Sequence, residues 1–152
     1  WDFNYLNVGP DGKGVYEQGI QAQEIDQDPY IDESTLPVLY LPVNKTVALN
    51  IESRDVVHSF WVPDFLYKKD MIPGKSNYIY FTPQKIGEYM GKCAELCGEY
   101  HSLMLFKVRV VSEADYQAHI QSLADKGQTG AIGPEYNTNT NLPGTEAPTG
   151  NE

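Results

Sequence analysis

The chain has 152 residues, of which 41% are hydrophobic, and a formal net charge of −10 at pH 7. This length suits one domain with a core of its own. The acidic balance argues against nucleic acid as a partner and favours a basic protein, and no run of eighteen apolar residues indicates a membrane-spanning helix.

The chain begins with alternating aromatic and polar side chains. Residues 1–6 therefore predict a half-buried strand, in which Trp1 packs as a buried aromatic. From about 9 to 37 the sequence becomes loop-like and acidic, and we interpret this stretch as an insertion between two strands. Its apolar residues, Val15 among them, are too sparse to predict a buried hairpin. The acids of its second half are Glu24, Asp26, Asp28, Asp32 and Glu33.

Short apolar or alternating stretches follow, and several of them end at a proline or another turn residue. They predict strands at 38–41, 46–51, 55–62, 75–82, 87–90 and 105–111. In the last of these, Phe106, Val108 and Val110 should point into the core. Strands this short and this evenly separated predict an all-β, antiparallel Greek-key sandwich or barrel.

A short C-terminal helix closes the domain. Ser112 and Asp115 form a start that resembles a capping box, and the apolar positions then follow one helical face to about residue 125. His119 lies on the other side of that helix, and we expect it at the surface. We place the domain at 1–126 and a flexible, disordered tail at 127–152, where Gly, Pro, Thr and Asn dominate.

Both cysteines of the chain lie in one loop, residues 93–104, together with His101 and Met104. Two thiols and an imidazole suit copper, zinc or an iron–sulfur cluster, and the thioether of Met104 favours copper. His58 offers a second imidazole far upstream, and a distant histidine with a Cys…His…Met loop is the ligand layout of cupredoxins. Two simpler alternatives stay open: a Cys93–Cys97 disulfide, or a structural zinc site that includes His101.

These motifs carry a family resemblance. Cys-x-Glu-x-Cys-x-x-x-His-x-x-Met, with Val-x-His-Ser-Phe-x-Val-Pro upstream, resembles subunit II of the haem–copper cytochrome c oxidases, in its soluble cupredoxin-like domain with the dinuclear copper A (CuA) centre. The resemblance covers about 43–111 and includes Asp70-Met-Ile-Pro-Gly74. The insertion is similar to that of the actinobacterial branch. Nitrous oxide reductase also has a CuA domain, but it typically carries Trp where this chain has Glu95.

The resemblance implies two copper ions held between the two cysteine thiolates. Its metal-ligating residues are His58, Cys93, Glu95, Cys97, His101 and Met104. His58 and Met104 would complete one copper ion. His101 and the backbone carbonyl of Glu95 would complete the other, and the Glu95 carboxylate would reach a magnesium ion at the contact with subunit I.

The same resemblance implies a role in electron transfer. The domain would accept electrons from a c-type cytochrome and pass them to haem in subunit I of a terminal oxidase, at the extracytoplasmic face of the cell membrane. N-terminal helices preceding this domain would anchor the full-length protein. Asp55 matches an acid that attracts basic cytochrome c, whereas Trp1 matches the second tryptophan of the family motif and not its electron-accepting one. The alternative function is copper storage or delivery without redox turnover.

Overall fold

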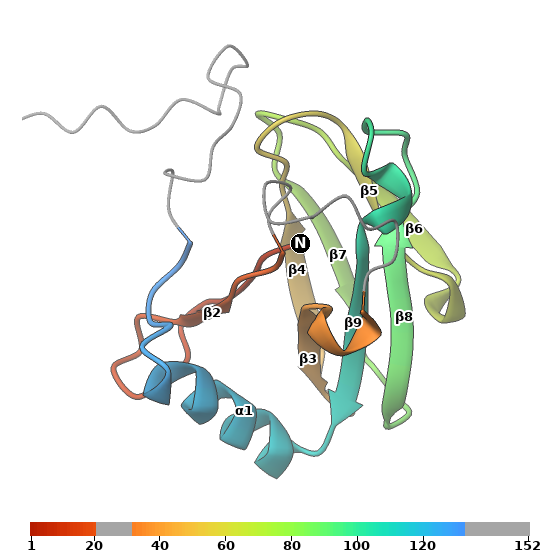
Figure 1. Ribbon diagram of the computed structural model, residues 1–152. Helices are drawn as coiled ribbons and strands as arrows, with labels where there is room; N and C mark the ends of the chain where they lie inside the picture. Colours follow the sequence, from red (N-terminus) through yellow and green to blue (C-terminus); the bar gives the residue numbers. More distant parts are fainter. Residues whose placement is uncertain (21–31, 133–152) are drawn as a thin grey trace, which may run out of the picture.

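A computed structural model describes residues 1–20 and 32–132 of the chain (Figure 1). Its strands are β1 (Phe3–Tyr5), β2 (Val15–Glu17), β3 (Val38–Pro42), β4 (Val47–Ile51), β5 (His58–Val62), β6 (Tyr67–Met71), β7 (Asn77–Phe81), β8 (Gly87–Cys93) and β9 (Leu105–Val111). The α-helix is α1 (Glu113–Asp125), and short 3-10 turns lie at η2 (Glu33–Thr35), η3 (Pro63–Phe65) and η4 (His101–Leu103). The all-β class with a short C-terminal helix is confirmed.

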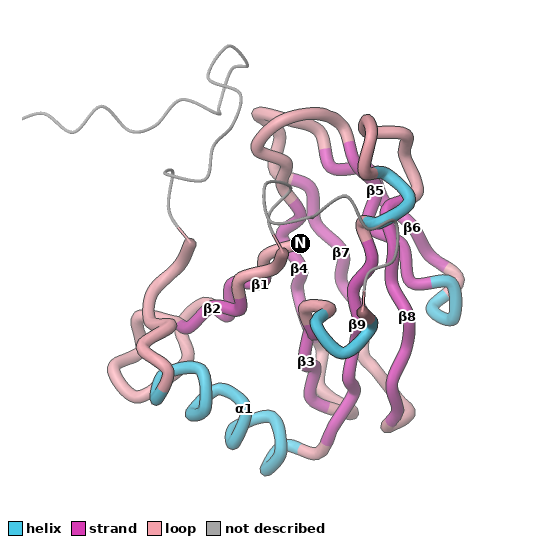
Figure 2. Tube along the Cα trace, in the orientation of Figure 1, coloured by secondary structure: helices cyan, strands magenta, loops and turns pink. Residues whose placement is uncertain are grey.

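Within the described residues, the strands form one five-stranded sheet and two strand pairs (Figure 2). The large sheet has the order β3-β9-β8-β5-β6, while β4 pairs with β7 and β1 with β2. Among the strands that the structure describes, every pairing is antiparallel except β3 with β9, which run parallel with Leu39 opposite Val108. The antiparallel expectation is wrong for this pair, because β3 and β9 are far apart in the chain and no hairpin dictates their relative direction.

The core follows from strict alternation along the strands. In β9, Phe106 and Val108 are fully buried and Val110 is 1% exposed, as expected for a strand with one face on the core. They join apolar side chains from both strand pairs, from β5 and from α1 in a single cluster. Burial of each large side chain contributes about 1.5–3 kcal/mol to the free energy of unfolding. The loop between β8 and β9 is thus attached to a rigid scaffold.

A buried hairpin at the start of the chain differs from the sequence prediction. Val15 is fully buried in β2, which pairs with β1. Gly14 makes this possible, because its φ is +94° and a Cβ there would lie 2.7 Å from the carbonyl of Tyr5. The predicted tail also begins with ordered residues: Thr129 bridges to Val15, and the Ile132 amide donates to Asn4 Oδ1 at 3.0 Å. Residues 133–152, and 21–31 of the acidic insertion, lie outside the described residues.

Helix α1 begins as predicted, with Ser112 Oγ accepting from the amide of Asp115 at 3.1 Å. The prediction for His119 is wrong. Its ring stacks on Tyr40 with centroids 3.7 Å apart, and its side chain is only 12% exposed. The helix packs against both β2 and β3, and Tyr40 of β3 covers the side of the helix that carries His119.

Two strands also differ from the sequence prediction. The strand predicted at 55–62 begins at His58, because Ser53 and Asp55 form a hydrogen-bonded turn before it. Strand β6 was not predicted, since its Tyr-Lys-Lys-Asp-Met sequence lacks apolar alternation; it is an edge strand of the large sheet, where polar residues are tolerated. Across residues 1–20 and 32–132 no helix combines the length and apolarity that crossing a membrane requires.

Candidate metal centre

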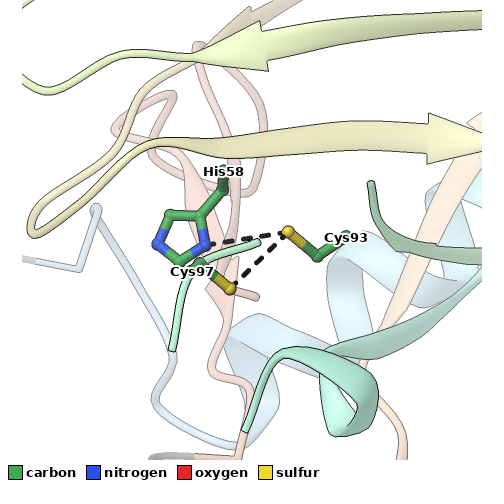
Figure 3. Close-up of side chains that lie close together, drawn as sticks. All are labelled: His58, Cys93 and Cys97. Atoms are coloured by element: carbon green, nitrogen blue, oxygen red, sulfur yellow. Dashed lines mark hydrogen bonds between the residues drawn. The ribbon is translucent and has the colours of Figure 1, made fainter. Parts of the chain in front are cut away.

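Strand pairing brings distant ligand candidates together. His58 is the first residue of β5 and Cys93 the last of β8, and these strands are paired, with Phe60 opposite Cys93. Cys93 Sγ lies 3.8 Å from His58 Nδ1 and 3.8 Å from Cys97 Sγ (Figure 3). Among the described residues these three form a group able to hold a metal ion, and His58 and Cys93 are buried.

The remaining candidates surround the same sulfurs. Cys97 Sγ lies 3.5 Å from His101 Nδ1 and 3.3 Å from Met104 Sδ. The backbone oxygen of Glu95 lies 3.2 Å from Cys93 Sγ. The structure therefore brings all the ligand candidates of the sequence into one cluster. Both cysteines are free thiols, and their sulfurs are too far apart for a disulfide bond.

Asp55 orients the buried histidine. Its Oδ1 lies 2.7 Å from His58 Nε2 and accepts the Val56 amide at 2.7 Å. With Nε2 committed to the carboxylate, Nδ1 faces the cysteine sulfur and is available to a metal. The sequence predicts only a docking role for Asp55. The Asp-x-x-His spacing was the signal for this contact, but it becomes informative only once the turn before β5 is known.

The Asp55–His58 pair shifts both protonation equilibria. Partial burial of Asp55 acts to raise its pKa, but the hydrogen bonds from His58 and the Val56 amide outweigh it and lower the pKa to about 2. Burial also acts to lower the pKa of His58. The hydrogen bonds with Asp55 and then with Cys93 act in the opposite direction and together outweigh burial. The pKa of His58 is therefore raised above 6.5. In the metal-free domain at mildly acidic pH, His58 is therefore a protonated imidazolium that the Asp55 carboxylate holds in place.

The two thiols are not equivalent. Burial acts to raise the pKa of Cys93, but hydrogen bonds with the Ser59 and Glu95 backbones and with His58 lower it. For Cys97, burial and then the neighbouring Cys93 thiolate raise the pKa to about 12. Two adjacent anions repel each other. A cation bound between the sulfurs would remove this repulsion, so the site is suited to a metal that binds both thiolates.

Trp1 is a further contact of the site that sequence analysis missed. The carbonyl of Met104 accepts two hydrogen bonds, from the Cys93 amide at 3.1 Å and from Trp1 Nε1 at 3.0 Å. The Trp1 ring packs against Phe106, with centroids 4.7 Å apart, which confirms its packing role, although the residue is half-buried and not buried as predicted. Met104 is therefore fixed through its backbone from two directions.

Backbone contacts also hold the loop between β8 and β9. The Ala94 amide donates to Ser59 O at 3.1 Å, and the His101 amide donates to Gly98 O at 3.2 Å. Gly98 has a φ of +122°, a conformation that side chains rarely allow. The loop therefore leads into η4, which begins at His101 and places its Nδ1 near Cys97 Sγ.

The donor set consists of two thiols, two imidazoles, a thioether and a backbone carbonyl. Soft sulfur with imidazole nitrogen fits copper, and the thioether is a usual weak ligand of copper electron-transfer sites. The fold and this donor set together define a cupredoxin-like domain with a thiolate–imidazole centre.

Comparison with known proteins identifies the family. Residues 15–111 match the family described as "Cytochrome C oxidase subunit II, periplasmic domain", and the chain belongs to this family. A probable cytochrome c oxidase subunit 2 of Streptomyces coelicolor is 51% identical over 119 residues, covering 78% of this chain and 36% of the relative. Cytochrome c oxidase subunit 2 of Mycobacterium tuberculosis H37Rv is 43% identical over 131 residues, which cover 82% of this chain and 36% of that relative. The predicted actinobacterial resemblance is confirmed.

The chain spans about a third of the length of these curated relatives, since the matches cover 36% of each. Among solved structures, it resembles the periplasmic domain of oxidase subunit II (CoxB) of Bradyrhizobium japonicum, with a TM-score of 0.67 and 30% identity over 83% of this chain and 86% of the other. A second similar structure is a mixed disulfide between a thioredoxin-like protein, TlpA, and subunit II, with a TM-score of 0.60 and 30% identity. The cupredoxin-like fold is thereby confirmed.

Proposed function

We propose that this domain binds two copper ions between Cys93 and Cys97 and transfers single electrons through them. The observation that carries the proposal is the pair of sulfurs 3.8 Å apart, each with an imidazole nitrogen beside it, at 3.8 Å for His58 and 3.5 Å for His101. Copper would supply the change of oxidation state. Met104 Sδ and the Glu95 carbonyl complete the two donor sets.

The protein's contribution is to keep these donors in place. Asp55 fixes the ring of His58, and the hydrogen bonds to the Met104 carbonyl fix the loop on β8. Ligands held by buried strands and short hydrogen bonds need move little when the charge of the site changes. The protein would supply the donors of both copper ions, which suits electron transfer and not catalysis on a substrate.

The partners follow from the family. We infer that a c-type cytochrome supplies the electrons and that haem in subunit I receives them, with the domain at the extracytoplasmic face of the membrane and anchored by helices of the full-length protein. The Glu95 side chain is exposed while its carbonyl faces Cys93. Its carboxylate is therefore free to bind magnesium at the contact with subunit I.

A thioredoxin-like reductant is a further partner that we infer for the metal-free domain. A relative forms a mixed disulfide with such a protein. Here the free thiols of Cys93 and Cys97 lie 3.8 Å apart, so small movements would allow an oxidant to join them. A dithiol would then reduce that disulfide through a mixed disulfide, becoming oxidised itself and returning both thiols for metal binding.

Variants of the two cysteines and of Met104 test the proposal. Either Cys→Ser change should abolish the dinuclear centre, because one sulfur cannot bridge two ions. Met104→Leu should keep both ions and change the reduction potential, because a thioether is a weak donor. A visible spectrum distinguishes the alternative function, since a mixed-valence dicopper–thiolate centre is intensely coloured and a storage site for Cu(I) is colourless. Equal copper loss in Met104→Leu and Cys97→Ser would contradict the assigned roles.

A further inference from the structure

The turn between β4 and β5, residues 52–57, carries Asp55 but buries none of its own side chains. All of its residues are exposed or half-buried, whereas His58 directly after it is buried. Val56 and Val57 are 40% and 38% exposed. Because core packing does not fix this turn, polar contacts must keep the Asp55 carboxylate beside the His58 ring.

Ser53 sets the shape of the turn from within. Its hydroxyl lies 3.1 Å from Asp55 Oδ1 and also contacts the backbone oxygen of Val56. The Val56 amide donates to the same carboxylate oxygen at 2.7 Å. These contacts join residues of the turn to one another, so they do not determine how the turn lies relative to the rest of the domain.

Arg54 connects the turn to two segments that are distant in the chain. Its Nη1 donates to Asp2 Oδ2 at 3.1 Å, and its Nη2 donates to the backbone oxygen of Ile132 at 3.3 Å. The side chains of Arg54 and Asp2 are 28% and 17% exposed, so this ion pair is more shielded from water than a surface pair. A planar guanidinium can direct separate N–H groups at two acceptors at once, and it is better suited to this than a lysine ammonium.

Both partners of Arg54 are themselves held in place. Asp2 Oδ1 accepts the Gly19 amide at 2.9 Å, which leaves Oδ2 facing Arg54. Ile132 is 8% exposed, and its amide donates to Asn4 Oδ1 at 3.0 Å. The guanidinium therefore attaches the turn to the start of β1 and to an ordered segment after α1.

We propose that Arg54 is a positioning residue of the metal centre. By fixing the turn it fixes the Asp55 carboxylate, and the carboxylate sets the ring of His58 with Nδ1 toward Cys93. The proposal rests on the copper-binding function proposed above and adds a residue one step further from the ions. The competing explanation is that the ion pair with Asp2 only stabilises the fold.

The charge of Arg54 gives the prediction a definite sign. Removal of a cation close to the site would, by charge alone, strengthen the binding of copper ions. Loss of positioning would weaken it instead. We expect Arg54→Gln to weaken copper affinity about tenfold, the lower end of the usual cost of losing an outer partner. Arg54→Lys keeps the charge and the pairing with Asp2 but not both contacts, and its affinity should lie between those of Arg54→Gln and the wild type.

Three measurements test this role: competition with a Cu(I) chelator, urea unfolding, and the ¹⁵N shifts of the His58 ring in the copper-free domain at one fixed pH. Arg54→Gln should weaken copper binding and move the His58 signals. Arg109→Gln is the matched control, because Arg109 is also paired but contacts Glu88 and Tyr40; it should leave both unchanged. In the Asp55→Asn background, Arg54→Gln should have no further effect on affinity, since the two residues act through one chain of contacts.

Four results would overturn the proposal. They are a loss of stability in Arg54→Gln without a change in affinity or in the His58 signals, a gain in affinity, losses that add in the Arg54→Gln/Asp55→Asn double variant, and an equal loss in Arg109→Gln. Arg54→Lys supplies the same comparison if Arg54→Gln does not fold. The His58 signals are recorded without copper. One copper per wild-type chain would therefore reject the proposed function while the role of Arg54 is still tested.

Discussion

At the scale of single residues, Asp55 controls how His58 faces the proposed metal centre. Its carboxylate holds Nε2 at 2.7 Å and leaves Nδ1 toward Cys93. We predict that Asp55→Asn weakens copper affinity by about 10–100-fold, the usual cost of losing an outer partner of a ligating histidine. Competition with a Cu(I) chelator measures the change.

Glu52→Gln is the matched control for this variant. Glu52 is a nearby exposed acid that accepts hydrogen bonds from Asn50 and Ser76 and has no contact with His58 among the described interactions. Its neutralisation should leave copper affinity unchanged. Equal losses in Glu52→Gln and Asp55→Asn would show a general charge effect and contradict the orienting role of Asp55.

Protonation of the proposed ligands should make copper binding depend on pH. With its pKa raised to about 12, the Cys97 thiol must release a proton at any ordinary pH. His58, whose pKa is raised above 6.5, must release another only below that pKa. Copper affinity should therefore rise with pH, more steeply below the pKa of His58 than above it. Chelator competition between about pH 5.5 and 8.5 measures this slope.

Asp55→Asn provides the internal check. Without the hydrogen bond to Asp55, the pKa of His58 should fall, because burial lowers it and the contact with Cys93 is then the remaining opposing cause. The break in the pH dependence of copper affinity should then move to lower pH. An affinity that does not vary with pH would contradict the protonation states assigned to the metal-free site.

At the scale of elements, Gly91 allows β8 to lie close to the core. A Cβ at this position would lie 2.2 Å from ring atoms of Phe106, which is fully buried. We predict that Gly91→Ala lowers the free energy of unfolding by about 1–3 kcal/mol, as overpacked cores do. Urea unfolding of the metal-free domain measures the loss.

Gly87→Ala is the control in the same strand. A Cβ there would approach the Tyr89 hydroxyl at 3.2 Å, and this is the end of a flexible side chain that can move. Gly87→Ala should therefore lower the free energy of unfolding clearly less than Gly91→Ala does. If both variants unfolded at the same urea concentration, the contact between Gly91 and Phe106 would not be the constraint.

Elements that bury one face were predictable, and those that depend on distant contacts were not. Alternation located β9 with the correct inward residues. Hairpin β1–β2 was missed because Val15 is buried through Gly14 and Thr129, which are not local apolar neighbours. The ligand set was predictable because its residue types and spacing are unusual. His119 was misplaced, because its burial depends on how α1 lies against Tyr40.

At the scale of the whole molecule, the net charge of −10 should attract a basic electron donor. We predict that the rate of reduction by a basic cytochrome c falls as salt rises, since charges are screened beyond about 8–10 Å at physiological ionic strength. Stopped-flow kinetics with an acidic cytochrome as control measures this. A rate that rises or stays constant with salt for the basic donor would contradict electrostatic attraction.

Deletion of the acidic insertion is a poor test of the same idea. A cut from residue 12 to 32 would remove Val15, which is fully buried, and all of β2. It would also remove Glu17, which accepts the amide of Val38 at 2.8 Å. Loss of electron transfer would then follow from damage to the core. Acid-to-amide changes within the insertion keep the hairpin and test the charge alone.

Copper stoichiometry combined with electron paramagnetic resonance tests the central claim most directly. With two ions joined by Cys93 and Cys97, the fully loaded chain should contain two coppers, and one unpaired electron shared equally between two equivalent nuclei should give a seven-line hyperfine pattern. One copper per fully loaded chain, with the four-line pattern of a single nucleus, would contradict the dinuclear centre.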